Sequence, residues 1–311
     1  MSIAFVFPGQ GAQAIGMGKD LADTYPAAKQ VFEEVDEALG EKLSSLIWDG
    51  DITELTLTAN AQPALMATSM AAMAALGAEG FKVEQAAFVA GHSLGEYSAL
   101  AAAGAISLAD AARLLRIRGT AMQDAVPVGQ GGMAALLGLT FDQASQVAEE
   151  AAMGEICVAA NDNDPAQVVV SGHKDAVERA VEGAKAAGAK RALVLPVSAP
   201  FHCPLMEPAA AKMAEALAEV SINRPVVPLV ANVLAHSVSD PSTIRSLLVQ
   251  QVTGAVRWRE SIMWLAEQGV TEYWEIGAGK ALSGMIKRID RGAVARNFAD
   301  SAGIEKLKAE A

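Results

Sequence analysis

The sequence predicts an α/β protein: an α/β-hydrolase-like core with a mainly parallel sheet, into which a small ferredoxin-like (βαββαβ) subdomain is inserted. Three observations lead to this prediction. Short apolar runs alternate with helical stretches along most of the 311 residues. Residues 88–103 read as a strand, a sharp turn and a small-residue helix, and residues 133–197 read as strand, helix, two strands, helix and strand. We therefore expect a large subdomain over 1–127 and 199–311 and a small one over 128–198.

The composition excludes several classes of protein. Hydrophobic residues make up 52% of the chain, enough to bury one large core together with a subdomain. The net charge of -12 argues against a nucleic-acid partner, because phosphate contacts need a basic surface. No apolar run reaches the roughly 20 residues of a membrane helix and no signal sequence follows Met1, so we expect no membrane contact and a cytoplasmic location. The two cysteines, Cys157 and Cys203, fit reduced thiols, and the four histidines form no Cys/His cluster, so no metal and no cofactor are expected.

The elements of the large subdomain follow from apolar periodicity and turn residues. Apolar runs of strand length predict strands at 3–7, 85–90, 226–231, 270–276 and 293–297. Stretches with a helical apolar period predict helices at 17–25, 63–77, 94–103, 108–125, 206–220, 241–252, 259–268 and after Lys280. Residues 43–48 and 55–61 are interpreted as connecting segments.

The small subdomain begins where the Pro- and Gly-rich linker 127–132 interrupts this alternation. Its strands are predicted at 133–139, 156–160, 167–171 and 191–197, and its helices at 141–153 and 174–188. The stretch Asn161-Asp162-Asn163-Asp164-Pro165 consists of turn-forming residues, so we interpret it as a loop. This loop would form a wall of the site only if it faced Ser93.

The central motif is Gly91-His92-Ser93-Leu94-Gly95, which matches the G-x-S-x-G pattern of a nucleophile elbow. A strand-like run precedes it and an alanine-rich helical stretch follows it, as the elbow requires. Glycines allow the tight turn that lifts a serine hydroxyl above the sheet edge. Ser93 is therefore the predicted nucleophile, and the alternative is an ordinary glycine-rich turn between a strand and a helix.

Two glycine-rich loops invite a nucleotide interpretation that the neighbouring sequence disfavours. Residues 9–14 satisfy G-x-G-x-x-A, but the acidic residues that follow lie in a helical stretch and not at the end of a second strand. The turn at Gly279-Lys280 lacks the first glycine and the Ser or Thr of a phosphate loop. A better interpretation is that the loop after Phe7 lends a backbone N–H to the Ser93 site.

The helix at 108–125 carries an arginine in an unusual position. Placed at 100° intervals, its apolar residues share one face, and Arg118 lies in the middle of that face. A guanidinium turned toward a core needs an anionic or strongly accepting partner and suits a carboxylate bound through two hydrogen bonds. The partner is either a substrate carboxylate or a distant acidic side chain, and this argument leaves both open.

His202 is the predicted base for Ser93, because a histidine at a strand end can reach a loop serine and titrates near working pH. The other three histidines fit less well. His92 adjoins the serine and is expected to point away, His173 begins a helix, and His236 lies in a polar loop. Cys203 is interpreted as a buried small residue.

These motifs occur in an order that resembles the malonyl-CoA:acyl carrier protein transacylase family. The matching blocks cover nearly the whole chain: Phe7-Pro8-Gly9-Gln10-Gly11, Gly91-His92-Ser93-Leu94-Gly95-Glu96, Arg118-Gly119, Met122-Gln123 and Pro200-Phe201-His202. The resemblance implies that malonyl-CoA and acyl carrier protein are the partners, and that Ser93 carries the malonyl group after His202 accepts its proton. It also implies an oxyanion hole from the N–H groups of Gln10 and Leu94, and a malonyl carboxylate bound by Arg118.

The resemblance assigns further residues around the site. Gln251 would orient His202 through its backbone carbonyl, which would explain why no aspartate stands out as a third member. Phe201 fits malonyl selectivity, and Met122, Asn161 and Asn163 are expected in the pocket. Because the carrier protein of this family is acidic, we expect it to dock on basic residues drawn from Lys190, Arg191, Arg257, Arg259, Lys280, Lys287 and Arg288.

Two other functions fit part of the same pattern. A serine esterase or thioesterase would share Ser93 and His202 without needing Arg118, and a binding protein with an inactive elbow would need none of the three. Malonyl transfer could serve fatty acid synthesis, which we expect, or polyketide synthesis. A monomer is the default expectation.

Overall fold

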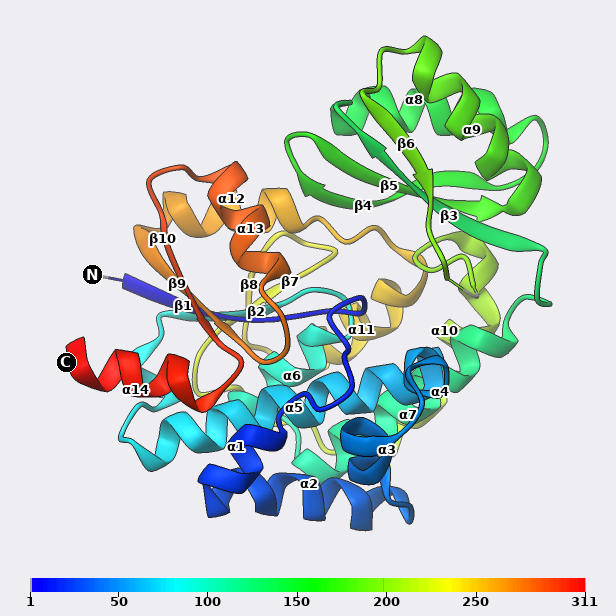
Figure 1. Cartoon of the computed structure of the whole chain (residues 1–311). Coiled ribbons are helices and arrows are strands. Elements are labelled where there is room, and N and C mark those ends of the chain that lie inside the picture. Colours follow the sequence, from blue (N-terminus) through cyan, green and yellow to red (C-terminus); the bar gives the residue numbers. More distant parts are fainter. Residues whose placement is uncertain (1, 198, 311) are drawn as a thin grey trace.

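A six-stranded sheet forms the centre of the large subdomain. The computed structural model describes residues 2–197 and 199–310, so the predicted domain limits at 1, 198 and 311 lie outside the described residues. The sheet order is β10-β9-β1-β2-β7-β8 (Figure 1). Its strands are β1 (Ser2–Phe7), β2 (Phe88–Gly91), β7 (Leu229–Ala231), β8 (His236–Val238), β9 (Val270–Ile276) and β10 (Val294–Phe298). All neighbours pair in parallel except β7 and β8, which confirms the prediction of a mainly parallel sheet.

Helices cover both faces of this sheet, and strand β1 shows why. Its side chains alternate: Phe5 and Phe7 pack into the cluster of helices α5 and α7, whereas Ala4 and Val6 pack against α12 and α13 on the opposite face (Figure 1). A strand buried on both faces reads as a continuous apolar run, as residues 3–7 do. The helices of this subdomain are α1 (Lys19–Thr24), α2 (Pro26–Leu39), α3 (Leu43–Asp49), α4 (Ile52–Thr56), α5 (Thr58–Ala78), α6 (Gly95–Ala102), α7 (Leu108–Asp124), α10 (Glu207–Ala218), α11 (Pro241–Thr253), α12 (Trp258–Glu267), α13 (Ala281–Ile289) and α14 (Ser301–Glu310). Two short 3₁₀ turns, Val83–Gln85 and Pro204–Met206, complete it.

The small subdomain has the predicted βαββαβ order. Its antiparallel sheet runs β4-β5-β3-β6, with helices α8 (Phe141–Ala152) and α9 (Lys174–Ala186) packed on one face. The strands are β3 (Gly131–Leu137), β4 (Cys157–Asp164), β5 (Gln167–His173) and β6 (Arg191–Val194). The first and third strands of the subdomain are central, which is the ferredoxin-like arrangement.

Several expectations about local structure were wrong. Residues 43–48, expected to connect other elements, form helix α3, and residues 55–61 end α4 and begin α5. Helix α5 also continues through Pro63, whose ring nitrogen cannot donate to the carbonyl of Ala59. Arg116 Nη1 donates to that carbonyl at 2.6 Å instead, so the helix loses no partner there. Strand β8 and helix α14 were not predicted.

The stretch 161–165 was also wrongly predicted as a loop. Asn161, Asp162 and Asp164 pair with β5, and the turn of this hairpin lies at Pro165-Ala166. The other edge of β4 bonds to the large subdomain: Val256 donates to the carbonyl of Ala160 at 2.9 Å, and Asp162 donates to that of Val256 at 2.9 Å. Pairing with β5 on one edge and with the distant Val256 on the other therefore overrode the turn propensity of these residues.

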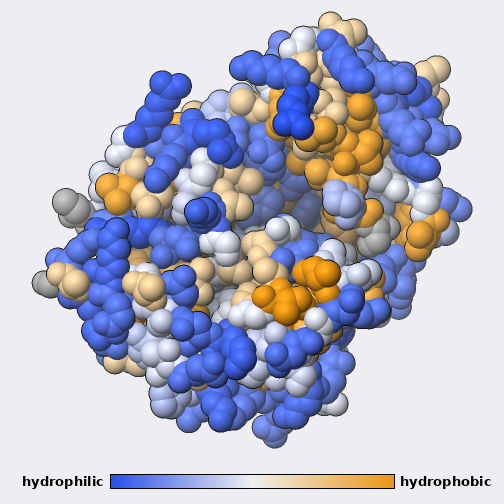
Figure 2. Space-filling model, viewed as in Figure 1, coloured by the Kyte–Doolittle hydropathy of each residue, from blue (hydrophilic) through white to orange (hydrophobic). Residues whose placement is uncertain are grey.

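Two ion pairs hold this strand against the large subdomain. The buried carboxylate of Asp162 lies 2.8 Å from Arg259 on α12, and that of Asp164 lies 2.8 Å from Arg288 on α13. A hollow remains between the two subdomains beside this contact (Figure 2). It is a cleft of about 480 Å³, and residues from both sheets line it.

Candidate active site

The turn after β2 has the geometry of the predicted elbow. Ser93 adopts a left-handed backbone conformation with φ of 53°, and the N–H of His92 donates to the carbonyl of Phe7 at 3.0 Å. A Cβ at Gly91 would collide with the backbone of Gly95, and a Cβ at Gly95 would collide with that of Phe7. Only glycine at both positions lets helix α6 start this close to the sheet. The turn thereby presents Ser93 at the floor of the cleft.

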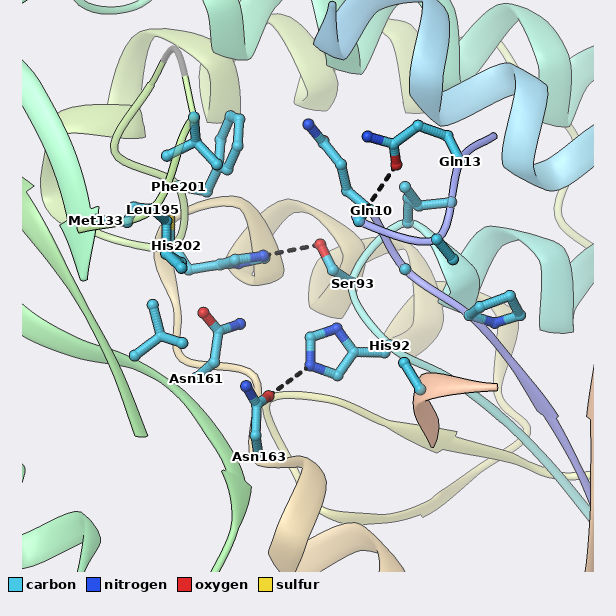
Figure 3. A pocket seen from close by; sticks show the side chains of 18 of the residues that line it. Gln10, Gln13, His92, Ser93, Met133, Asn161, Asn163, Leu195, Phe201 and His202 are labelled. Carbon is cyan, nitrogen blue, oxygen red and sulfur yellow. Dashed lines mark hydrogen bonds between the residues drawn. The ribbon is translucent and has the colours of Figure 1, made fainter. Parts of the chain in front are cut away.

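Ser93 and His202 form a hydrogen-bonded pair, as the sequence predicted. Ser93 Oγ lies 2.8 Å from His202 Nε2 (Figure 3). His202 Nδ1 lies 2.8 Å from the carbonyl oxygen of Gln251. A carbonyl oxygen only accepts, so Nδ1 carries the proton and Nε2 is free to accept from the serine hydroxyl. Burial and the charge of Arg118 lower the pKa of His202 to about 3, which keeps Nε2 unprotonated.

Two backbone N–H groups border the serine in the expected positions. Gln10 follows β1, Leu94 follows the nucleophile, and both line the cleft. Within residues 2–197 and 199–310, neither N–H has an acceptor. Unpaired N–H groups beside a nucleophile are the arrangement that stabilises an oxyanion. The side chain of Gln10 is held away by Thr58, to whose hydroxyl it donates at 3.3 Å.

Arg118 lies next to this pair and is almost completely buried, with 1% of its surface exposed. Its Nη1 donates to Gln62 Oε1 at 2.8 Å, and its Nη2 donates to Gln251 Oε1 at 2.8 Å and to Ser93 Oγ at 3.2 Å. No carboxylate among the described residues forms an ion pair with it, and its Nε has no partner there. The distant acid that could have neutralised Arg118 is thus not in contact with it. A buried cation held by neutral amides is a site for an external anion.

Gln251 connects the parts of the site. Besides its two contacts with His202 and Arg118, its Nε2 donates to the carbonyl of Ser93 at 3.0 Å and to Glu96 Oε2 at 2.8 Å. Burial raises the pKa of Glu96 to about 7. The hydrogen bonds from Asn232 and Gln251 and the charge of Arg118 act in the opposite direction and lower this pKa, but burial is the larger effect. One residue therefore fixes both the histidine and the arginine relative to the serine.

The remaining predicted residues line the cleft. Met122 and Phe201 supply apolar walls, and Asn161 and Asn163 extend from β4 of the small subdomain (Figure 3). His92 does not point out of the site as expected: it also lines the cleft, and its Nε2 lies 2.8 Å from Asn163 Oδ1. The other two histidines lie elsewhere: His173 accepts from the N–H of Ile156, and His236 is exposed at the start of β8. Cys203 is buried as predicted, and its thiol lies 3.1 Å from the carbonyl of Pro200.

Comparison with known proteins places this site in a family. The model of the acyl transferase domain matches residues 4–288. The chain belongs to this acyl transferase family. It is 49% identical over 286 residues to the malonyl CoA-acyl carrier protein transacylase of Escherichia coli K12, which covers 92% of each chain. An acyl-carrier-protein-S-malonyltransferase structure from Bartonella henselae is 55% identical, with a TM-score of 0.97 over 100% of this chain and 99% of the other. A type II PKS acyl-carrier protein in complex with its malonyl-transacylase gives a TM-score of 0.97 at 43% identity, covering all of both chains.

Sequence reasoning missed three residues of this acyl transferase site: Gln62, Glu96 and Asn232. Each is buried and within hydrogen-bond distance of a predicted residue. The signals were present, because Gln62 and Glu96 lie in helices made mostly of small or apolar residues, and Asn232 directly follows an apolar strand. None of the described helices is long and apolar enough to cross a bilayer. In the same residues, no group of three or more His, Cys, Asp or Glu side chains is placed to hold a metal ion.

Proposed function

We propose that this acyl transferase domain moves a malonyl group from malonyl-CoA to the phosphopantetheine thiol of acyl carrier protein, through an O-malonyl ester on Ser93. The observation that carries the proposal is Arg118, a buried cation 3.2 Å from the nucleophile with only neutral partners. Malonyl thioesters bring a free carboxylate, which a guanidinium binds through charge-assisted hydrogen bonds. The names of the relatives from Escherichia coli and Bartonella henselae support the same substrate.

In the first half of the reaction, Ser93 Oγ bonds to the thioester carbon while its proton passes to His202 Nε2. The oxyanion that forms accepts hydrogen bonds from the N–H groups of Gln10 and Leu94. Its collapse breaks the carbon–sulfur bond, and the proton on His202 passes to the sulfur that leaves as coenzyme A.

In the second half, the carrier thiol gives its proton to His202 and its sulfur attacks the ester carbon. The carbon–Oγ bond breaks, and Ser93 regains the proton. The ester must survive until the thiol arrives, so water has to be kept from it. Met122 and Phe201 are the apolar side chains that we assign to this task.

The carrier protein docks, in this proposal, on basic residues beside the cleft. Of the seven that the sequence suggested, Arg257, Arg259 and Arg288 form ion pairs with acidic residues of the chain itself. Their charges are therefore less available to a partner. The basic residues left are Lys190, Arg191, Lys280 and Lys287, all exposed and without an ion pair among the described residues.

These four flank both sides of the cleft. Lys190 precedes the edge strand β6 and Arg191 begins it, and the chain continues from this strand into Leu195 at the cleft wall. Apolar surface borders the hollow on the side of the small subdomain (Figure 2). Lys280 and Lys287 bracket the cleft-lining residues of α13. An acidic carrier placed between the two pairs would bring its pantetheine arm toward Ser93.

The decisive experiment weighs the intact protein after incubation with malonyl-CoA. We expect a stable malonyl adduct that is lost in Ser93→Ala and kept in Ser246→Ala, an exposed serine on α11. Added carrier protein should remove the adduct and become malonylated. Free malonate without an adduct would indicate a hydrolase instead, and no reaction would indicate a binding protein.

Charge reversal tests the docking surface separately. The double variant Lys190→Glu/Lys280→Glu should lower kcat/KM for carrier protein at least tenfold and leave adduct formation from malonyl-CoA unchanged. Lys306→Glu on the distant helix α14 is the matched control. Equal turnover of carrier protein in all three proteins would refute this surface.

We propose further that the malonylated carrier feeds fatty acid synthesis and that the protein is cytoplasmic. We also propose that it is a monomer and that its subdomains have the limits expected from the sequence. Sedimentation and limited proteolysis at the 127–132 linker would test the last two points.

A further inference from the structure

Asn232 lies beneath the nucleophile, and no step of the reaction above uses it. It directly follows β7, and 1% of its surface is exposed. Its side chain reaches back to the elbow, where Oδ1 accepts from the N–H of Ser93 at 2.8 Å and Nδ2 donates to the carbonyl of Gly91 at 2.7 Å. These two backbone groups are the ones that flank His92. A single carboxamide thus bridges the two sides of the turn.

The carboxamide cannot be turned around. The Ser93 N–H can only donate and the Gly91 carbonyl can only accept, so one end of the side chain must be an acceptor and the other a donor. The main chain of Asn232 is fixed as well, because its N–H donates to Glu96 Oε2 at 3.1 Å and its carbonyl accepts from the N–H of Arg257 at 3.1 Å. Every polar group of Asn232 is therefore in use.

The contacts of Asn232 stabilise the unusual backbone conformation of the elbow. The left-handed conformation of Ser93, with φ of 53°, is strained for a residue with a side chain and persists only when its surroundings impose it. The turn also partly buries the N–H of Ser93, which needs an acceptor. Because Asn232 occupies that N–H, the N–H of Leu94 is the one at the turn that remains for the oxyanion.

We propose that Asn232 is a positioning residue for the nucleophile, a clamp that holds Ser93 Oγ in line with His202 by bonding to both sides of the turn. The inference deepens the proposed function, since it assumes that Ser93 is acylated. It does not depend on which acyl group is transferred, because the clamp contacts the serine backbone and not the carboxylate-binding Arg118.

The substitution Asn232→Asp separates the two halves of the clamp. An ionised aspartate can accept from Ser93 but cannot donate to Gly91, whereas a protonated one can do both. The ionisable groups bonded to this network are Glu96, directly, and Arg118 and His202 through Gln251. Burial of the new aspartate and the Gly91 carbonyl that faces it both favour the protonated form, so recovery is expected in the mildly acidic range. His202 remains an unprotonated base there.

The experiment measures single-turnover acylation of Ser93 at pH 8 and at pH 5.5. Each protein is tested with malonyl-CoA and, in parallel, with p-nitrophenyl acetate. The proteins are the wild type, Asn232→Asp, Asn232→Ser and the exposed control Asn223→Asp. We expect the maximal rate of both Asn232 variants to fall 10- to 100-fold at pH 8, with KM changed less than threefold. Asn232→Asp should recover at least fivefold at pH 5.5 relative to the wild type, and Asn232→Ser should not.

Circular dichroism shows whether each variant is folded. If a folded Asn232 variant is acylated on Ser93 at the wild-type rate, the clamp is overturned. A loss confined to KM, or no acid recovery in a folded Asn232→Asp protein, would also overturn it. If Asn232→Asp fails to fold, Asn232→Ser decides by the rate and KM criteria. Wild-type protein that reacts with p-nitrophenyl acetate but not with malonyl-CoA would refute the proposed substrate and still leave the clamp testable.

Discussion

The Nδ1 of His202 lies 2.8 Å from the main-chain carbonyl oxygen of Gln251, so a neutral peptide group orients the proposed base. Serine enzymes with a complete triad use a buried carboxylate at this position, which also stabilises the imidazolium that forms. Here a positive group, Arg118, also lies 3.2 Å from the serine hydroxyl. The resting site is therefore built to keep the histidine neutral, and this has consequences for its dependence on pH.

The first prediction concerns the rate of acylation. Because burial and Arg118 lower the pKa of His202 to about 3, the base stays unprotonated throughout the mildly acidic range. We expect the maximal rate of Ser93 acylation by malonyl-CoA to vary less than threefold between about pH 5 and pH 8. Quenched-flow mass spectrometry would measure it. An acid limb near the ordinary histidine value of about 6.5 would contradict the prediction.

The second prediction concerns stability and Glu96. Its pKa is raised from 4.5 to about 7 in the folded protein, chiefly by burial. Folding is then favoured by the protonated form: the contribution is full below pH 4.5 and is lost as pH rises through about 7, and it amounts to about 3 kcal/mol. The variant Glu96→Gln cannot titrate. We expect the melting temperature of the wild type to fall relative to Glu96→Gln between pH 4.5 and pH 8.

His202 has the opposite effect on stability, because its lowered pKa makes stability rise with pH between about 3 and 6.5. This effect is the same in the wild type and in Glu96→Gln, so comparing the two proteins removes it. Scanning calorimetry at four or five pH values is sufficient. Parallel curves for the wild type and Glu96→Gln would show that Glu96 is ionised in the folded protein across this range.

The third prediction concerns selectivity. Replacing Arg118 by Ala removes the buried cation, and a charge-assisted contact is worth about 1.5–3 kcal/mol, or roughly 10- to 150-fold. We expect kcat/KM for malonyl-CoA to fall by about that factor while acetyl-CoA is used as well as before or better. Arg118→Lys should recover little, because an ammonium cannot span Gln62, Gln251 and a carboxylate together. Arg113→Ala, exposed on the same helix, is the control.

The residues proposed for the chemistry could be predicted from the sequence more readily than the contacts that hold them in place. Ser93, His202 and Arg118 could be found because each is unusual for its place: a serine between glycines, a histidine at a strand end, an arginine on an apolar face. Asn232 and Gln62 could not be assigned, since their partners lie 139 and 56 residues away in the chain. Contacts of that range are set by the packing of the sheet and its helices, which no local pattern encodes.

The same reason explains the errors in the fold. Long periodic segments such as α7 and β9 were predicted to within about a residue, because one buried face determines their pattern. The stretch 161–164 was wrongly predicted because alternate residues contact two different parts of the protein, the cleft and the large subdomain. Asn161 and Asn163 face the cleft, whereas Asp162 and Asp164 meet arginines of the large subdomain. Turn-forming composition thus concealed a strand with a period of two.

The fourth prediction uses that contact between subdomains. The side chain of Asp162 is 1% exposed, whereas that of its partner Arg259 is 27% exposed. Arg259→Met leaves a buried carboxylate without its cation, which should lower the free energy of unfolding by about 3 kcal/mol. Asp162→Asn leaves an arginine that can turn toward water, so the loss should be only about 1 kcal/mol. Urea unfolding should therefore give a clearly lower midpoint for Arg259→Met than for Asp162→Asn.

The asymmetry should also depend on pH in one direction. Burial already raises the pKa of Asp162, and loss of Arg259 raises it further, so protonation relieves the unpaired charge as the solution becomes acidic. The deficit of Arg259→Met relative to the wild type should shrink between pH 8 and pH 5, while that of Asp162→Asn stays constant. Equal and pH-independent losses in the two variants would mean that this ion pair contributes through packing alone and that charge does not hold β4 against α12.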